Sequence, residues 1–183
     1  MLLLSIGAKG GLGTTTLAYQ ISQCAGALPL DAADGQLLRW VGGAGLDLSA
    51  VPQWTASRRS RAVEHLIRTR PALLWTPACN VWAAAVAAFV RDLAAVGHVS
   101  VDGGLAPPAP LVDLATVILI VSSDDPVARW HEQRLKQQWP QARALVGDVQ
   151  AAAPALVEQL LGVPPRQAWW KQARSWRPTG KNA

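Results

Sequence analysis

The sequence has few residues of the kinds that build disulfide scaffolds, metal clusters or hydrolase triads. It contains two cysteines, Cys24 and Cys79, which lack metal-ligand spacing and lie among apolar residues. We therefore expect reduced, buried thiols rather than a disulfide or a nucleophile. The three histidines, His65, His98 and His131, are scattered and form no motif with a serine or cysteine, so a hydrolase triad has little support.

Charged residues are also scarce, at 16%, whereas half of the 183 residues are hydrophobic. This composition argues against disorder, and the length suits one domain with a substantial core. The apolar residues 1–6 have no basic segment before them, and the longest later run, residues 81–90, is too short to cross a bilayer. We therefore predict neither a signal peptide nor a membrane span, and expect a cytoplasmic protein.

Acidic residues are absent from the last part of the chain. Residues 166–183 carry five basic side chains and no Asp or Glu, which accounts for the whole net charge of +5. Three tryptophans, Trp169, Trp170 and Trp176, lie among them. This tail is expected to follow a nucleotide-binding domain of residues 1–165. It could contact a membrane surface, nucleic-acid phosphate or the protein's own core. Its basic residues are Arg166, Lys171, Arg174, Arg177 and Lys181.

A glycine-rich stretch, residues 7–16, follows the first apolar run and precedes an apolar-periodic segment. This order is typical of a strand, a phosphate-binding loop and a helix, because backbone N–H groups and the helix dipole converge on one anion. A plain strand-to-helix turn is the alternative. The residues predicted to bind the nucleotide are Lys9, Gly10, Gly11, Leu12, Gly13, Thr14, Thr15 and Thr16.

The pattern Lys-Gly-Gly-x-Gly-x-Thr-Thr resembles the deviant Walker A motif of the ParA/MinD family of ATPases. Gly-Thr-Thr-Thr is most similar to the CpaE/TadZ-like branch, which acts in pilus assembly and at septum sites. The resemblance implies ATP and Mg²⁺ as cofactors and a homodimer in which Lys9 reaches the partner's nucleotide. It also implies that Thr15 binds the metal. Thr14 replaces the second lysine of the ordinary motif.

Later acidic residues complete the predicted site. Asp102 ends a β-branched strand, as a carboxylate that reaches Mg²⁺ or its water shell requires. Asp31 and Asp34 follow the second strand, where relatives orient the attacking water, but Ala33 holds the family's second Asp position. Asp34 could equally form a turn with Gly35. Asp148 takes the place of a base-contacting Asn and could accept a hydrogen bond from adenine.

Strands alternate with helices along the chain, which predicts an α/β fold with a mostly parallel sheet, helices on both faces and the ligand at the carboxyl ends of the strands. Residues 36–53 read as a loop and residues 105–113 as a mobile segment. Helices are expected over residues 15–25, 57–70, 81–96, 124–139 and 153–161, and strands over 1–6, 27–30, 72–76, 98–102, 116–122 and 142–146.

The sequence therefore predicts an ATP-dependent switch that positions a pilus, division or partition apparatus. The absence of the second lysine and the presence of Ala33 in place of an Asp predict slow or negligible hydrolysis. Two alternatives remain open: a partition ATPase that binds nonspecific DNA through the tail and the arginines of residues 58–70, and a scaffold that binds no nucleotide. Those arginines could equally form a solvated helix face.

Overall fold

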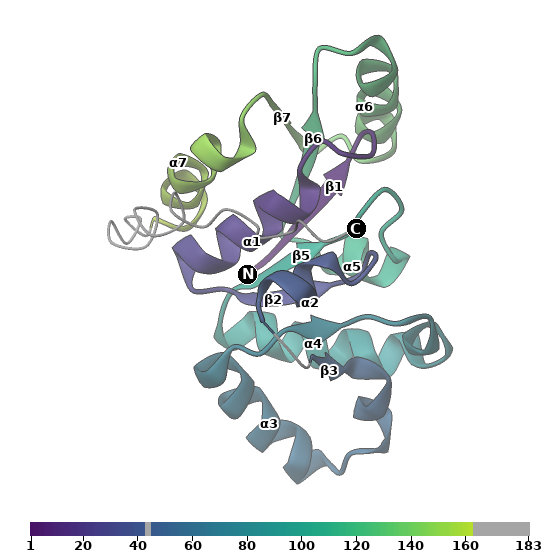
Figure 1. Ribbon diagram of the computed structural model, residues 1–183. Helices are drawn as coiled ribbons and strands as arrows, with labels where there is room; N and C mark the ends of the chain where they lie inside the picture. Colours follow the sequence, from purple (N-terminus) through teal and green to yellow (C-terminus); the bar gives the residue numbers. More distant parts are fainter. Residues whose placement is uncertain (43–44, 163–183) are drawn as a thin grey trace, which may run out of the picture.

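The computed structural model describes residues 1–42 and 45–162, and its core is a seven-stranded sheet whose strands are all parallel (Figure 1). The strand order is β3-β4-β2-β5-β1-β6-β7. The strands are β1 Leu2–Gly7, β2 Leu28–Asp31, β3 Leu46–Asp47, β4 Leu73–Leu74, β5 Val99–Asp102, β6 Val117–Ser122 and β7 Arg143–Val146. The predicted α/β class and parallel pairing are confirmed.

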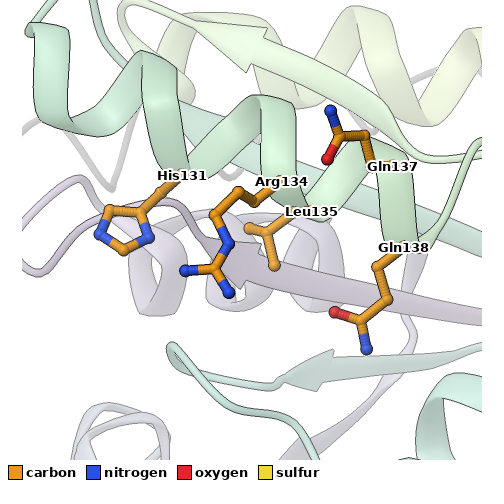
Figure 2. A pocket seen from close by; sticks show the side chains of 5 residues that line it. All are labelled: His131, Arg134, Leu135, Gln137 and Gln138. Atoms are coloured by element: carbon orange, nitrogen blue, oxygen red, sulfur yellow. The ribbon is translucent and has the colours of Figure 1, made fainter.

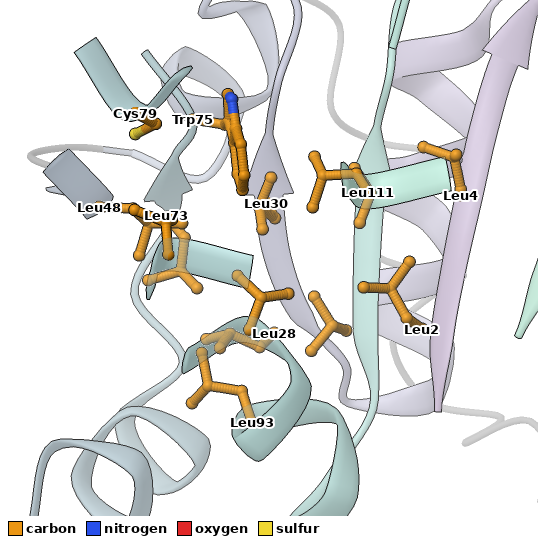
Figure 3. Packing of buried hydrophobic residues seen from close by; sticks show 14 of the residues in the cluster. Leu2, Leu4, Leu28, Leu30, Leu48, Leu73, Trp75, Cys79, Leu93 and Leu111 are labelled. Carbon is orange, nitrogen blue, oxygen red and sulfur yellow. The ribbon is translucent and has the colours of Figure 1, made fainter. Parts of the chain in front are cut away.

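Helices cover both faces of the sheet, as predicted. The α-helices are α1 Thr14–Ala25, α2 Gln36–Trp40, α3 Ala56–Thr69, α4 Ala83–Val96, α5 Ala109–Leu114, α6 Pro126–Gln138 and α7 Val149–Leu161, and the 3-10 helices are η1 Leu48–Gln53 and η2 Pro77–Trp82. Helices α1 and α7 pack on one face over Leu3, Leu119 and Val121. Helices α3 to α6 pack on the other over Leu2, Leu4 and Ile6. Figure 3 shows Leu2 and Leu4 in this core together with Leu93 of α4 and Leu111 of α5.

The central strands are buried because both of their faces are covered. Every residue of β1 and all but the first residue of β6 are buried, which explains why these two strands are nearly continuous apolar runs rather than alternating patterns. Alternate residues serve different layers: Leu2 and Leu4 enter the larger core, whereas Leu3 enters the smaller one. The strand that leads into the phosphate loop is therefore held rigidly from both sides.

Three segments contain more regular structure than the sequence predicts. Residues 36–53 form α2, β3 and η1 rather than a loop, and residues 109–114 form α5 within the predicted mobile segment. Helix α7 starts at Val149 rather than at residue 153, because the Asp148 carboxylate accepts hydrogen bonds from the amides of Gln150 and Ala151. The residues of the C-terminal tail, 166–183, lie outside the described part of the chain.

The two thiols and the apolar helix can be compared directly with expectation. Cys24 and Cys79 are free and buried, as predicted, and burial raises the pKa of Cys24 to about 11. Within residues 1–42 and 45–162, one helical stretch, Pro77–Val96, is long and apolar enough to cross a membrane by length and composition alone, so the run exceeds the expected length. Its Phe89, Val90 and Leu93 pack into the larger core, and a core helix passes the same test.

Candidate functional site: the phosphate loop at the carboxyl edge

The glycine-rich loop joins the end of β1 to the start of α1 at the carboxyl edge of the sheet. Gly11 and Gly13 have φ angles of 79° and 92°, a region that L side chains rarely adopt. The loop is anchored at its start by hydrogen bonds from Gly7 N to Gly104 O (2.8 Å) and from Ala8 N to Val121 O (2.9 Å). Its base is thus tied to the segment after β5 and to β6.

The N-terminus of α1 is free to bind an anion. Gly13 is the N-cap, no side chain caps the helix and its first turn holds no acidic residue. The first amides of the helix therefore keep their hydrogen-bonding capacity, and the helix dipole adds partial positive charge at the same point. This arrangement suits a phosphate group.

The two threonines that begin α1 lie in different surroundings. A Cβ built on Gly7 would lie 2.7 Å from Thr14 Oγ1, so the Thr14 hydroxyl folds back against the base of the loop. Thr15 lies toward β5, where burial raises the pKa of Asp102 and the Thr15 hydroxyl offsets part of that rise. These positions are compatible with the prediction that Thr15, and not Thr14, binds the metal.

Asp102 is fully buried at the end of β5, beside Ser5 of β1 in the sheet register. Its Oδ1 accepts a hydrogen bond from Gly104 N (3.1 Å), whereas Oδ2 has no hydrogen-bond partner among the described residues. Burial raises the pKa of this carboxyl, and the nearby acids Asp31 and Asp34 raise it further. A buried oxygen without a partner calls for a ligand, a cation or an ordered water.

This donor set fits a magnesium ion held jointly with a nucleotide. Among residues 1–42 and 45–162, no group of three or more His, Cys, Asp or Glu side chains could hold a metal alone. Mg²⁺ typically takes one or two protein oxygens and completes its coordination with water and substrate phosphates. Thr15 and Asp102 would supply the protein oxygens, directly or through water.

Asp31 is buried at the end of β2, directly beside Asp102 in the register, yet both of its oxygens accept hydrogen bonds from the backbone. Oδ1 accepts from the amides of Ala33 and Gly35, and Oδ2 accepts from the amide of Leu38, at 3.1–3.2 Å. The carboxylate therefore holds the turn from β2 into α2. Asp34 is exposed and accepts a hydrogen bond from Gln36 N.

Lys9 forms an ion pair that the sequence does not indicate. Its Nζ lies 3.2 Å from Asp125 Oδ2, and both side chains are about half exposed, at 46% and 40%. The other Asp125 oxygen caps α6 by accepting from Val127 N and Ala128 N. The Ala128 amide and the Lys9 ammonium hold the pKa of Asp125 below its usual value. The partnership of Lys9 and Asp125 spans 116 positions and has no local signal in the sequence.

The junction of β7 and α7 also reaches the loop. A Cβ on Gly13 would lie 3.0 Å from Val149 Cγ2, so the residue after Asp148 packs against the start of α1. Leu105 contributes from a third side, with Cδ2 3.2 Å from a Cβ built on Gly7. The structure thus brings residues of the loop together with Leu105, Asp125 and Val149. No sequence motif marks these last three as site residues.

A separate cavity of about 510 Å³ lies along α6 (Figure 2). All of its lining residues belong to that helix, and none is a predicted site residue. They are His131, Arg134, Leu135, Gln137 and Gln138.

No protein-family model and no curated protein sequence matches the chain. Among solved structures, it is similar to a ParA family ATPase from Chlorobium tepidum TLS, with a TM-score of 0.61 and 14% identity over 90% of this chain and 82% of that one. It also resembles a variant of Cyanothece McdA in complex with ATP, with a TM-score of 0.45 and 17% identity over 88% and 79% of the two chains. The fold, a seven-stranded parallel sheet flanked by helices, is that of the ParA P-loop ATPase.

Proposed function

We propose that the chain is a nucleotide switch that binds ATP and Mg²⁺ at the phosphate loop and dimerises in the bound state. The observation that carries this proposal is the pairing of an uncapped helix N-terminus with the partnerless buried oxygen of Asp102. The first suits phosphate and the second suits a cation or its water shell. Either feature alone is common, whereas a helix N-terminus and a free carboxylate oxygen that lie on either side of Thr15 suit a metal-bound nucleotide.

Dimerisation at this edge is supported by the distribution of exposed apolar side chains. Seven large hydrophobic residues are exposed in the described part of the chain, and six follow or end strands at the carboxyl edge. Only Val96 lies at the opposite edge. Lys9 occupies the same edge, where a second copy would meet it. The six residues are Val81, Trp82, Leu105, Val127, Trp130 and Val146.

Hydrolysis in this switch is expected to be slow. Thr14 has no charge to offer the terminal phosphates, and an electrostatic contact of that kind is typically worth ~3–4 kcal/mol in the transition state. Ala33 is turned toward Gly104, whose Cβ position would lie 2.9 Å from it, and so offers no group to orient water. We expect turnover below ~1 s⁻¹ with nucleotide binding retained.

The loop motif also suggests which cellular apparatus the switch would recruit. Gly-Thr-Thr-Thr in the loop favours the CpaE/TadZ-like branch and hence recruitment of a pilus or septum apparatus, at the pole or at the inner face of the membrane in the cytoplasm. Residues 166–181, which would make the membrane or DNA contact, lie outside the described part of the chain.

Calorimetry with ATP–Mg²⁺, followed by gel filtration with and without the nucleotide, tests the switch. Wild type should bind and shift from monomer to dimer, and Lys9→Ala should bind but stay monomeric. Arg91→Ala, which removes an exposed cation on α4, is the matched control and should dimerise normally. Absence of ATP–Mg²⁺ binding would remove the proposal. Dimerisation of Lys9→Ala with no nucleotide bound would instead favour the scaffold.

A DNA-partition role is the second candidate because α3 is strongly basic. Arg58, Arg59, Arg61 and Arg68 form no ion pair within residues 1–42 and 45–162, and Arg58 stacks on Trp54 at 4.6 Å. This role predicts ATP-stimulated DNA binding that weakens steeply with salt. Combined Arg61→Gln and Arg68→Gln changes should then reduce that binding, whereas unchanged binding would exclude α3 as the contact.

A further inference from the structure

A second cavity lies away from the predicted nucleotide residues, between α1, α2 and the start of β2. It encloses about 390 Å³, a size typical of sites for small ligands. Tyr19, Ser22 and Gln23 line it from α1, Trp40 from α2 and Pro29 from β2, and Arg70 closes one side. None of its lining residues belongs to the phosphate loop, so a ligand here would not compete directly with ATP.

Arg70 adopts a backbone conformation that an arginine seldom takes. It ends α3 with φ 52° and is the only non-glycine residue with positive φ among those the structure describes. Glycine is the usual residue at such a helix end. An arginine retained in a strained conformation points to a role for its side chain.

The guanidinium of Arg70, a cavity-lining residue, lies beside Gly26 at the end of α1. A Cβ on Gly26 would lie 2.7 Å from its Nη1, so only glycine at the end of α1 leaves room for it. Within residues 1–42 and 45–162, the guanidinium makes no ion pair and no hydrogen bond, and no Asp or Glu lines the cavity. An anion is the ligand that complements this charge.

Two aromatic rings line the same cavity as the positively charged Arg70. Tyr19 and Trp40 pack edge to face, with ring centroids 5.9 Å apart at 86°. Both residues are half-buried, and both line the cavity. Aromatic walls favour planar apolar groups, while Ser22 and Gln23 add polar groups beside them. The site therefore combines a cation for one end of a ligand with aromatic contacts for the other.

We propose that the cavity between α1 and α2 binds a small planar organic anion, with Arg70 contacting its carboxylate or phosphate and Tyr19 and Trp40 packing on its ring. The competing structural explanation is that Arg70 only offsets the negative end of the α1 dipole. The two explanations predict opposite consequences of replacing Arg70 with glycine.

The binding test uses the indole N–H signal of Trp40 in the full chain, assigned by its loss in Trp40→Phe. Indole-3-acetate and phenyl phosphate are the carboxylate and phosphate probes, and neutral indole-3-acetamide is the matched control ligand. One of the anions should shift the Trp40 signal saturably with a Kd of about 1 mM or tighter. A preference between the anions identifies the acidic group. No saturable shift by ~10 mM of either anion, or equal binding of the amide, would overturn the proposal.

Variants of Arg70 separate ligand binding from stability. Arg70→Gln should weaken anion binding about tenfold, whereas Arg68→Gln, an exposed arginine of the same helix outside the cavity, should not change it. Arg70→Gly should lose binding and melt at the same or a higher temperature, because glycine relieves the strained φ. A lower melting temperature with unchanged anion binding would assign Arg70 to the helix end and overturn the proposal.

Discussion

Strands β2 and β5 end in neighbouring buried carboxylates that differ in how many hydrogen bonds they accept. Asp31 and Asp102 are paired in the sheet register, and both are almost inaccessible to solvent. Asp31 accepts three backbone hydrogen bonds, whereas Asp102 accepts one and keeps Oδ2 without a partner in the described residues. A carboxylate whose two oxygens both accept backbone hydrogen bonds shapes the chain, and one with a free oxygen is available to a ligand.

This difference sharpens the two predicted roles. Asp31 accepts from two amides in the turn from β2 into α2 and from the Leu38 amide within α2, so the residue fixes where α2 begins. Asp102 instead sits beside the first turn of α1, close to the Thr15 hydroxyl, and keeps one buried oxygen without a partner among the described residues. Catalysis by Asp31 stays a prediction, but any such role must share a carboxylate already engaged by the backbone.

The largest effect should come from Asp31→Ala. Three partly buried amides lose a charged acceptor, and hydrogen bonds to charged groups each contribute roughly 1.5–3 kcal/mol, so we expect a loss of about 3 kcal/mol or more in the free energy of unfolding. Urea denaturation measures it. Asp34→Ala is the matched control, because exposed Asp34 accepts a single local hydrogen bond. Equal losses for both variants would contradict a structural role for Asp31.

Asp102→Asn should have the opposite effect on the unliganded protein. Burial raises the pKa of Asp102, so its charge opposes folding at neutral pH and the neutral amide should raise the melting temperature. The same change should weaken Mg²⁺-dependent ATP binding by roughly 10- to 100-fold, as loss of a group that orients a bound metal does. Exposed Asp92 on α4 provides the control variant, Asp92→Asn.

The pH dependence of this second variant has a defined sign. Below the unfolded-state pKa, Asp102 is protonated in both states and contributes no charge penalty. As pH rises from that value through the higher folded-state pKa, the penalty grows, and above the folded-state pKa it is constant. The unfolding free energy of wild type should therefore fall relative to Asp102→Asn from acid to neutral pH. A difference that stays flat would show that Asp102 is not destabilised by burial.

The sequence predicts best what is encoded locally. The apolar run of β1, the glycines after it and the periodicity of α1 define strand, loop and helix without help from the rest of the chain, and the β-branched strand that ends in Asp102 needs only its own pattern. Helix α2 is missed because Asp31, five residues before its start, stabilises it through Leu38, a contact that no capping pattern describes. The segment reads as a glycine-rich loop for this reason.

Long-range contacts in the site follow the same rule. Lys9 and Asp125 lie on different loops, and only the adjacency of β1 and β6 brings them together. The contacts of Leu105 and Val149 with the loop likewise depend on strand order, which the alternation of helices and strands does not specify. Local sequence therefore identifies the loop, and the tertiary fold supplies its neighbours.

The smallest expected effect concerns the half-exposed ion pair beside the loop. Asp125→Asn keeps the N-cap of α6, since Asn caps as well as Asp, and should leave the melting temperature unchanged. It releases Lys9 from its own chain, so nucleotide-dependent dimerisation should tighten about two- to fivefold, the scale of an exposed ion pair. Sedimentation equilibrium with ATP–Mg²⁺ measures this change.

Asp124→Asn is the matched control for that variant, because Asp124 is the exposed neighbour and pairs with Arg129 instead of Lys9. The gain from Asp125→Asn should also shrink with rising salt, because screening already weakens the Lys9–Asp125 pair in wild type. Equal dimerisation by the two variants would show that Asp125 does not compete for Lys9. Weaker dimerisation by Asp125→Asn alone would show that this carboxylate belongs to the dimer contact rather than opposing it.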